Sequence, residues 1–242
     1  MRIPRVFSSQ SMTVNEALSL DAESSKYLTR VLRMQAGDPV ILFNGDGNDY
    51  HSVIGTVGRN VSVEISTQQR NPSESTLKIT LVQSLAKGTK LDLIIQKATE
   101  LGAHRISPIS NERSILRIDT DRTKRKMDHW RNVAISACAQ CNRSVIPQID
   151  SPMSFADWLA LSEPENTFLL HPHTDRSFGD VTVTQSRCSV VVGPEGGFSE
   201  AEFAQSVEHG ITPVRCGPRI LRTETAGFTA ISILQARFGD LH

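Results

Sequence analysis

The chain has 242 residues, enough for one large domain or two small ones with their own hydrophobic cores. It carries 26 Lys and Arg residues against 26 Asp and Glu residues, so its formal net charge is zero. A polyanionic partner must therefore bind a local basic patch and not the surface as a whole. The opening sequence lacks the apolar run of a secretory signal, and no stretch is long and apolar enough to span a membrane. These features predict a soluble cytoplasmic protein without a membrane partner.

The first part of the chain is typical of a small β domain. Residues 23–34 have a helical pattern, and three short strands are expected at 39–43, 49–57 and 60–65. The polar stretch 66–76 contains a proline and has no apolar face, so it is interpreted as a linker. Strands at this spacing favour a small barrel or sandwich.

From residue 77 onward the pattern changes to alternating strands and helices. Strands are expected at 77–85, 106–109, 167–171, 188–193 and 212–217, and helices at 90–103, 121–140, 155–161, 199–209 and 223–238. Ser199 and Glu202 have the spacing of a capping box at the start of one of these helices. The alternation predicts an α/β fold with a largely parallel sheet and helices on both faces.

The four cysteines do not form a metal-site pattern. Cys138 and Cys141 lie in a CAQC sequence inside an expected helix, and Cys188 and Cys216 are isolated. A structural zinc site needs four ligands, and the loose pair His171 and His173 does not make a site by itself. The cysteines are interpreted as packing residues and no metal is expected, with a redox pair or weak metal site as the alternative.

Three loops are expected to meet at the carboxyl edge of the parallel sheet. They follow Leu170, Val192 and Cys216, and the middle one reads GPEGGFS. Its glycines allow a ligand to approach the backbone closely, but Glu195 argues against a phosphate. A ligand with hydroxyls or positive charge fits better, and S-adenosylmethionine has both. A tight turn without a ligand is the alternative reading of this loop.

GPEGGFSEAE (193–202) and CGPRILRTETA (216–226) resemble the two signature motifs of the bacterial 16S ribosomal RNA uridine-N3 methyltransferases, the ribosomal RNA small subunit methyltransferase E family. The similarity continues through MRIPRVF (1–7), RVLRMQAGD (30–38), IQKATELGA (95–103) and AISACAQCNRSVIPQI (134–149). It implies a SPOUT α/β methyltransferase domain over 73–242 with a C-terminal trefoil knot. It also implies a PUA-like RNA-binding β-barrel with linker over 1–72, and a homodimer.

The resemblance also implies the cofactor and the residues that hold it. S-adenosylmethionine is expected to contact Leu170, His171, Gly193, Pro194, Glu195, Gly196, Gly197, Cys216, Gly217, Ile220, Leu221, Thr225 and Ala226. For methylation at uracil N3 the N3 proton must leave, and a nearby guanidinium stabilises the negative charge that develops on the base. Arg222 is the first candidate for this catalytic role, and Arg219 is the second.

The expected partner is 16S ribosomal RNA, within the 30S subunit. The candidate RNA-binding residues are basic and come from both parts of the chain, namely Arg2, Arg5, Arg30, Arg33, Arg122, Lys124, Arg125 and Lys126. A solvated helix face is the plainer reading of any one charge run. Two alternatives to the function stay open: a SPOUT enzyme with another target, such as a ribose 2′-hydroxyl, and a non-catalytic RNA-binding assembly factor.

Overall fold

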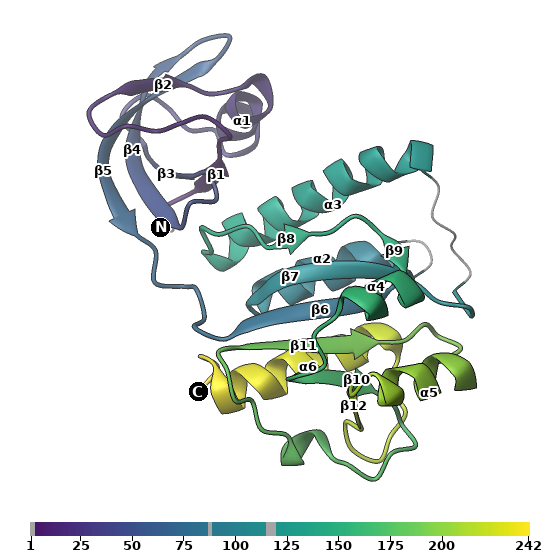
Figure 1. Cartoon of the computed structure of the whole chain (residues 1–242). Helices are drawn as coiled ribbons and strands as arrows, with labels where there is room; N and C mark the ends of the chain where they lie inside the picture. Colours follow the sequence, from purple (N-terminus) through teal and green to yellow (C-terminus); the bar gives the residue numbers. More distant parts are fainter. Residues whose placement is uncertain (1–2, 87–88, 115–119) are drawn as a thin grey trace. The chain divides into compact units, whose positions relative to one another are not determined.

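The computed structural model describes residues 3–86, 89–114 and 120–242, and it divides into two compact units (Figure 1). Unit 1 comprises Met1–Glu74 and Cys138–Ile146, and unit 2 comprises Ser75–Ala137 and Pro147–His242. Unit 1 is therefore discontinuous in sequence. This differs from the sequence-based division at residue 72, which left the whole of 138–146 in the second domain.

Unit 1 is built on a five-stranded sheet with the order β1-β3-β4-β5-β2. The strands are β1 Arg5–Phe7, β2 Ala17–Ser19, β3 Pro39–Phe43, β4 Asn48–Val57 and β5 Val61–Arg70. The pair β1–β3 is parallel, and the other pairs are antiparallel. Leu28, Leu42, Ile54 and Val63 are fully or almost fully buried in its core.

Two local predictions for unit 1 need correction. The expected linker 66–76 is strand as far as Arg70, because β5 keeps pairing with β4 up to Asn48 opposite Arg70. Residues 66–70 are exposed and polar, so they carry no alternating pattern that would have identified a strand. The helical patch is a short α1 (Ala22–Lys26), with Asp21 as its N-cap, followed by a π-helical turn at Tyr27–Val31.

Unit 2 contains a parallel sheet in which β12-β10-β11-β6-β7-β8 are neighbours in that order and β9 also pairs with β7. Its strands are β6 Lys78–Ser84, β7 Ala103–Ser110, β8 Gln148–Ile149, β9 Met153–Ser154, β10 Thr167–Leu170, β11 Arg187–Val192 and β12 Thr212–Val214. Its helices are α2 Lys90–Glu100, α3 Thr120–Cys141 (which continues into unit 1), α4 Phe155–Leu161, α5 Glu200–Glu208 and α6 Thr223–Phe238. The predicted parallel α/β arrangement is confirmed.

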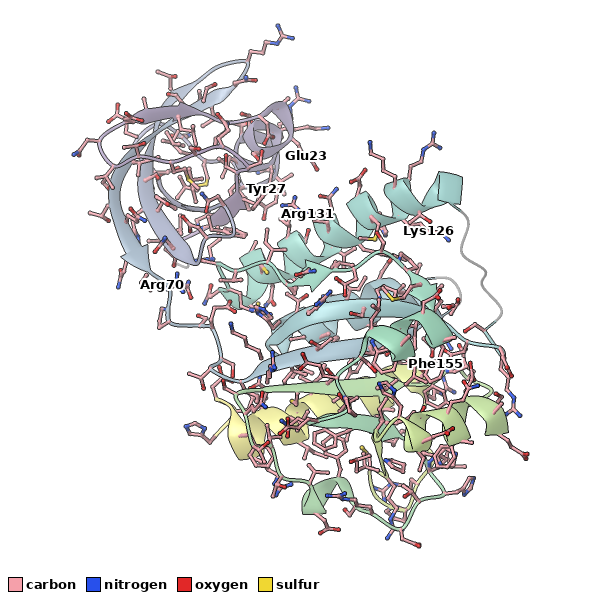
Figure 2. All side chains as sticks on the ribbon, viewed as in Figure 1. Glu23, Tyr27, Arg70, Lys126, Arg131 and Phe155 are labelled. Atoms are coloured by element: carbon pink, nitrogen blue, oxygen red, sulfur yellow. The ribbon has the colours of Figure 1, made fainter. Side chains whose placement is uncertain are left out.

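Helices cover both faces of the sheet: α2 and α6 lie on one, and α4 and α5 on the other (Figure 1). On the second face lies Phe155, at the start of α4 (Figure 2). Its ring packs against those of Trp158 and Phe198. The predicted capping box of α5 is present, since Ser199 and Glu202 exchange side-chain to backbone hydrogen bonds. No helix within the described ranges is long and apolar enough to cross a membrane.

Candidate functional site

A cavity of about 580 Å³ lies at the carboxyl ends of β10, β11 and β12 in unit 2. These strands are neighbours and run parallel, so the loops that follow them meet at one edge of the sheet. All the predicted cofactor residues except Thr225 line this cavity, together with Arg219 and Arg222. Thr225 is exposed on the first turn of α6.

The glycine loop that follows β11 is a tight turn whose backbone faces the cavity. The N–H of Gly197, which has a φ of +70°, donates to the carbonyl of Pro194 at 2.9 Å. Gly193 packs so closely that an added Cβ would lie 2.9 Å from the ring of Phe198. Glycine at 193 and 197 is therefore required by the shape of the loop.

Buried hydrogen bonds join the glycine loop to the loop that precedes α6. The Thr223 hydroxyl donates to the carbonyl of Gly193 at 2.8 Å, and Gln83 Nε2 donates to that hydroxyl at 2.9 Å. Gln83 and Thr223 are both buried, at 0% and 6% exposure. The central strand β6 thus anchors two of the three cavity loops.

The loop between β10 and β11 is fastened to the segment after β12. The N–H of Phe178 donates to the carbonyl of Arg215, and the N–H of Arg215 donates to the carbonyl of Arg176, each at 3.0 Å. Arg237, near the end of α6, donates to the carbonyl of Phe178 at 3.1 Å. These contacts hold the loop between β10 and β11, the third of the cavity loops, in place.

His171 forms part of the cavity wall at the end of β10. Its ring lies 4.3 Å from the Phe203 ring and 5.8 Å from that of His173. Burial, with a smaller contribution from the charge of His173, lowers the pKa of His171 below its ordinary value of 6.5. The imidazole is therefore neutral at pH 7. Its Nδ1 is buried without a hydrogen-bond partner among the described atoms, so it can bond to a ligand.

Most of the charged residues that border the cavity are cations, although the chain as a whole is neutral. These are Lys90, Arg113, Arg215, Arg219 and Arg222. Glu195 also borders the cavity and forms an ion pair with Lys90 at 2.8 Å, and the hydrogen bond that Lys90 donates to Glu195 raises the pKa of Lys90. Its carboxylate, assigned from sequence to a ligand, is therefore at least partly neutralised by the protein.

Sequence reasoning missed several lining residues. Pro172, His173, Val192, Phe198, Val214, Arg215 and Thr223 are next to predicted positions and could have been found by extending the motifs. Lys90 follows β6, which is the neighbour of β11 in the sheet, and Arg113 follows β7, which is the next strand beyond β6. The strand order, which the sequence did not reveal, is what brings these two cations to the cavity.

The candidate RNA-binding residues have different surroundings. Arg30, Arg33, Lys124 and Arg125 are exposed, and Lys126 is half-buried on α3 (Figure 2). Arg5 is buried and forms a bidentate ion pair with Asp49 at 2.8 and 2.9 Å, so its guanidinium does not face the surface. Arg2 and the side chain of Arg122 lie outside the described residues.

All four cysteines are free thiols. Burial raises the pKa of Cys138 and Cys188 to about 12 and that of Cys216 to about 11, so these three stay protonated at neutral pH. Such thiols are poor nucleophiles and poor metal ligands. Within the part of the chain that the structure describes, no three His, Cys, Asp or Glu side chains form a group that could hold a metal ion.

Comparison with known proteins finds similarity to RNA methyltransferases over nearly the whole chain. The family described as RNA methyltransferase domain matches residues 73–235, and the family described as RNA methyltransferase PUA domain matches residues 20–65. The ribosomal RNA small subunit methyltransferase E of Buchnera aphidicola subsp. Acyrthosiphon pisum is 34% identical over 242 residues, covering 99% of this chain and 95% of that protein. The protein of the same name from Bacillus subtilis is 30% identical and covers 89% and 88%.

Two solved structures extend this similarity to the fold. A methyltransferase from Legionella pneumophila, in complex with the cofactor SAM, has a TM-score of 0.95 and 36% identity, with 100% of each chain covered. A ribosomal RNA small subunit methyltransferase E from Neisseria gonorrhoeae, bound to S-adenosyl methionine, has a TM-score of 0.93 and 30% identity, again with 100% of each chain covered.

Proposed function

Because the chain belongs to the ribosomal RNA small subunit methyltransferase E family, we propose that it methylates N3 of a specific uridine in 16S ribosomal RNA. It is an S-adenosylmethionine-dependent ribosomal RNA methyltransferase. The observation that supports the proposal most strongly is the cavity where both signature motifs meet within a border of cations. The motif loops suit the cofactor that carries the electrophilic methyl group, and the cations suit a polyanionic substrate.

The cavity residues fit the cofactor chemically. Leu170, Ile220 and Leu221 offer apolar walls for an adenine, and the glycine loop offers backbone donors and acceptors to a small polar ligand. The unpartnered Nδ1 of His171 is one further hydrogen-bonding atom at the wall. When bound, S-adenosylmethionine supplies an activated methyl group, so the protein mainly needs to align the base with it.

Arg222 is the residue that we propose to stabilise the uracil anion. It is the N-cap of α6, its backbone is extended at φ −63° and ψ 155°, and its exposed side chain borders the cavity. A guanidinium is always charged and offers paired N–H groups to a carbonyl oxygen. Arg219 borders the same cavity and is the second candidate.

The PUA-like unit and α3 are proposed to bind the ribosomal RNA. Arg30 and Arg33 belong to unit 1, and Lys124, Arg125 and Lys126 belong to α3 in unit 2. These residues form the proposed set within the described part of the chain, and the buried Arg5 is excluded from it. We propose that the substrate is the 30S particle in the cytoplasm.

We also propose that the C-terminal segment passes through a trefoil knot and that the enzyme is a homodimer. The resemblance to SPOUT enzymes is one support for the knot. The other is that the loop after β10 is hydrogen-bonded both to Arg215, which follows β12, and to Arg237 of α6. The homodimer is proposed from the same resemblance.

The direct test incubates the protein with methyl-labelled S-adenosylmethionine and 30S subunits that lack the modification, and then maps the methylated nucleotide. Label on N3 of one uridine supports the proposal. Label on a ribose 2′-hydroxyl shows a different target, and cofactor binding without transfer shows an assembly factor. We propose that the cofactor binds without a metal, so cofactor binding and transfer should survive excess chelator.

A further inference from the structure

Arg113 reaches the cavity from a turn that the signature motifs do not include. The turn follows β7, and Arg113 Nη1 donates to the carbonyl of Gly196 at 3.0 Å. The residue is exposed, and among the described residues it has no ion-pair partner. A guanidinium has five N–H groups, so the bond to Gly196 leaves four to bind another group.

A buried carboxylate holds this turn against the glycine loop. Glu202 is 4% exposed, and its Oε1 accepts hydrogen bonds from Asn111 Nδ2 at 3.1 Å and from the N–H of Glu112 at 2.9 Å. Its Oε2 accepts from the N–H of Ser199 at 2.9 Å. Of these three bonds to the Glu202 carboxylate, the capping box requires only the one from Ser199. The two additional bonds therefore fix the turn that carries Arg113.

The other side of the turn is anchored as well. The Ser84 hydroxyl, at the end of β6, lies 2.5 Å from Asn111 Oδ1, to which it donates, and 2.8 Å from the carbonyl of Val192. The N–H of Asn111 donates to Ser114 Oγ at 2.9 Å. Arg113 is thus an exposed cation on a backbone that buried groups hold in register with the glycine loop.

We propose that Arg113 binds a phosphate of the RNA strand next to the target nucleotide, and that Glu202 is the positioning residue that orients it. This inference rests on the proposed function. A guanidinium fork matches a phosphate in geometry and charge. Arg113 contributes to the same cationic border as Arg219 and Arg222, while Glu195 is paired with Lys90, so the border favours an anion. A phosphate there would place the neighbouring base at the cavity mouth.

The test compares Arg113→Ala, Arg113→Lys and Glu202→Gln with the wild type in single-turnover methyl transfer to unmodified 30S subunits. Arg187→Ala is the matched control, because Arg187 is an exposed arginine at the amino end of β11, opposite the cavity edge, and is ion-paired with Glu163. Half-saturating subunit concentration, plateau rate and S-adenosylmethionine affinity are measured for each variant.

Arg113→Ala should raise the half-saturating subunit concentration about tenfold and lower the salt dependence of binding by about one phosphate contact. The plateau rate and cofactor affinity should change less than about twofold. Arg113→Lys should recover part of the loss. Glu202→Gln should act in the same direction, and the double variant should be little worse than Arg113→Ala, since both residues serve one contact.

Three results would overturn the inference. If Arg113→Ala lowers only the cofactor affinity, Arg113 stabilises the glycine loop. If it lowers only the plateau rate, Arg113 contacts the reacting base. If subunit binding is unchanged, Arg113 does not belong to the RNA site. If the wild type methylates another nucleotide, or none, the proposed function fails. Even then, the affinity of the same variants for the same 30S subunits shows whether Arg113 contributes to RNA binding.

Discussion

The hydroxyl of Thr223 donates to the carbonyl of Gly193 at 2.8 Å, and both residues line the cavity. The first residue of α6 is thereby bonded to the first residue of the glycine loop, and Gln83 from β6 completes the connection. Gly193 belongs to one signature motif and Thr223 to the other. This hydroxyl therefore helps to set the distance between the two motifs at the cavity.

We therefore expect Thr223→Val to weaken S-adenosylmethionine binding by about tenfold or more. The variant leaves the Gly193 carbonyl without its donor and one N–H of the Gln83 amide without its acceptor in a buried site, which costs about 1–3 kcal/mol. Thr223→Ser keeps the hydroxyl and should bind nearly as well as the wild type. Calorimetric titration measures the affinities, and equal affinity in the valine variant would show that the loops are held by other contacts.

Two substitutions in the glycine loop should impair cofactor binding for different reasons. At Gly193 a Cβ would lie 2.9 Å from Phe198, so Gly193→Ala should lower the melting temperature as well as cofactor affinity. At Gly196 the nearest contact of a Cβ is an ordinary 3.5 Å to Arg113. Gly196→Val should therefore fold and yet lose cofactor binding, because a β-branched side chain occupies the ligand's approach to the backbone. Thermal melts and calorimetry on both variants separate the two effects, and normal cofactor binding by Gly196→Val would place the ligand elsewhere.

The elements that the sequence predicted well have strong local signals. The strand Pro39–Phe43 and the helix Phe155–Leu161 have the predicted bounds, and α6 begins at the predicted Thr223. Strand β5 was predicted too short because its last residues are polar and exposed, although Thr67–Arg70 pair with β4 beyond a register shift at Ser66. Local pattern reports side-chain burial, whereas pairing in a sheet satisfies the backbone regardless of polarity.

The parts of the site that sequence missed depend on long-range pairing. Lys90 and Arg113 come to the cavity because β6 lies between β11 and β7, and no spacing along the chain encodes that order. Arg5 was misjudged as a surface cation because its partner, Asp49, is 44 residues away. A charge run in a sequence shows the charge but not whether the fold neutralises it.

The ion pair between Arg5 and Asp49 predicts a pH-dependent stability. Burial by itself raises the pKa of Asp49, but hydrogen bonds from Arg5, Ser144 and Asn71 and the charge of Arg5 outweigh it and hold the pKa below the ordinary 3.8. The stabilisation is therefore complete above pH 3.8 and is lost as the pH falls through the lower folded-state value.

Asp49→Asn should lower the stability of unit 1 by about 3 kcal/mol at pH 7, since it leaves the Arg5 guanidinium buried without its counter-charge. The difference from the wild type should shrink as the pH drops below about 4. Denaturant unfolding followed at several pH values measures it, with the exposed Asp240→Asn as a control. A difference that stays constant down to pH 2 would contradict the ionic origin.

A fragment of residues 73–242 should bind S-adenosylmethionine with normal affinity, because every lining residue of the cavity belongs to unit 2. We expect it to form dimers but to methylate 30S subunits poorly, since unit 1 is removed. Residues 138–146 also lose their partners in unit 1: Ser144 its bonds with Arg5 and Asp49, and Asn142 its bond from Asn71. The fragment should therefore melt at a lower temperature than the full chain. Light scattering, calorimetry and transfer assays test this, and full activity would remove the RNA-positioning role of unit 1.

Arg222→Ala should lower the single-turnover rate of methyl transfer by roughly 10²–10³, the usual cost of one preorganised donor to a developing anion. Cofactor affinity should change little, because the guanidinium is exposed at the cavity border and does not form its floor. Arg222→Lys should restore only part of the rate, since an ammonium cannot reproduce the planar fork. A purely structural role, in an ion pair with Glu224 or in a dimer contact, predicts a lower melting temperature or a loss of dimer mass instead. Rate, affinity and mass measured on one preparation distinguish these roles, and a near-normal rate in a stable dimer would transfer the catalytic assignment to Arg219.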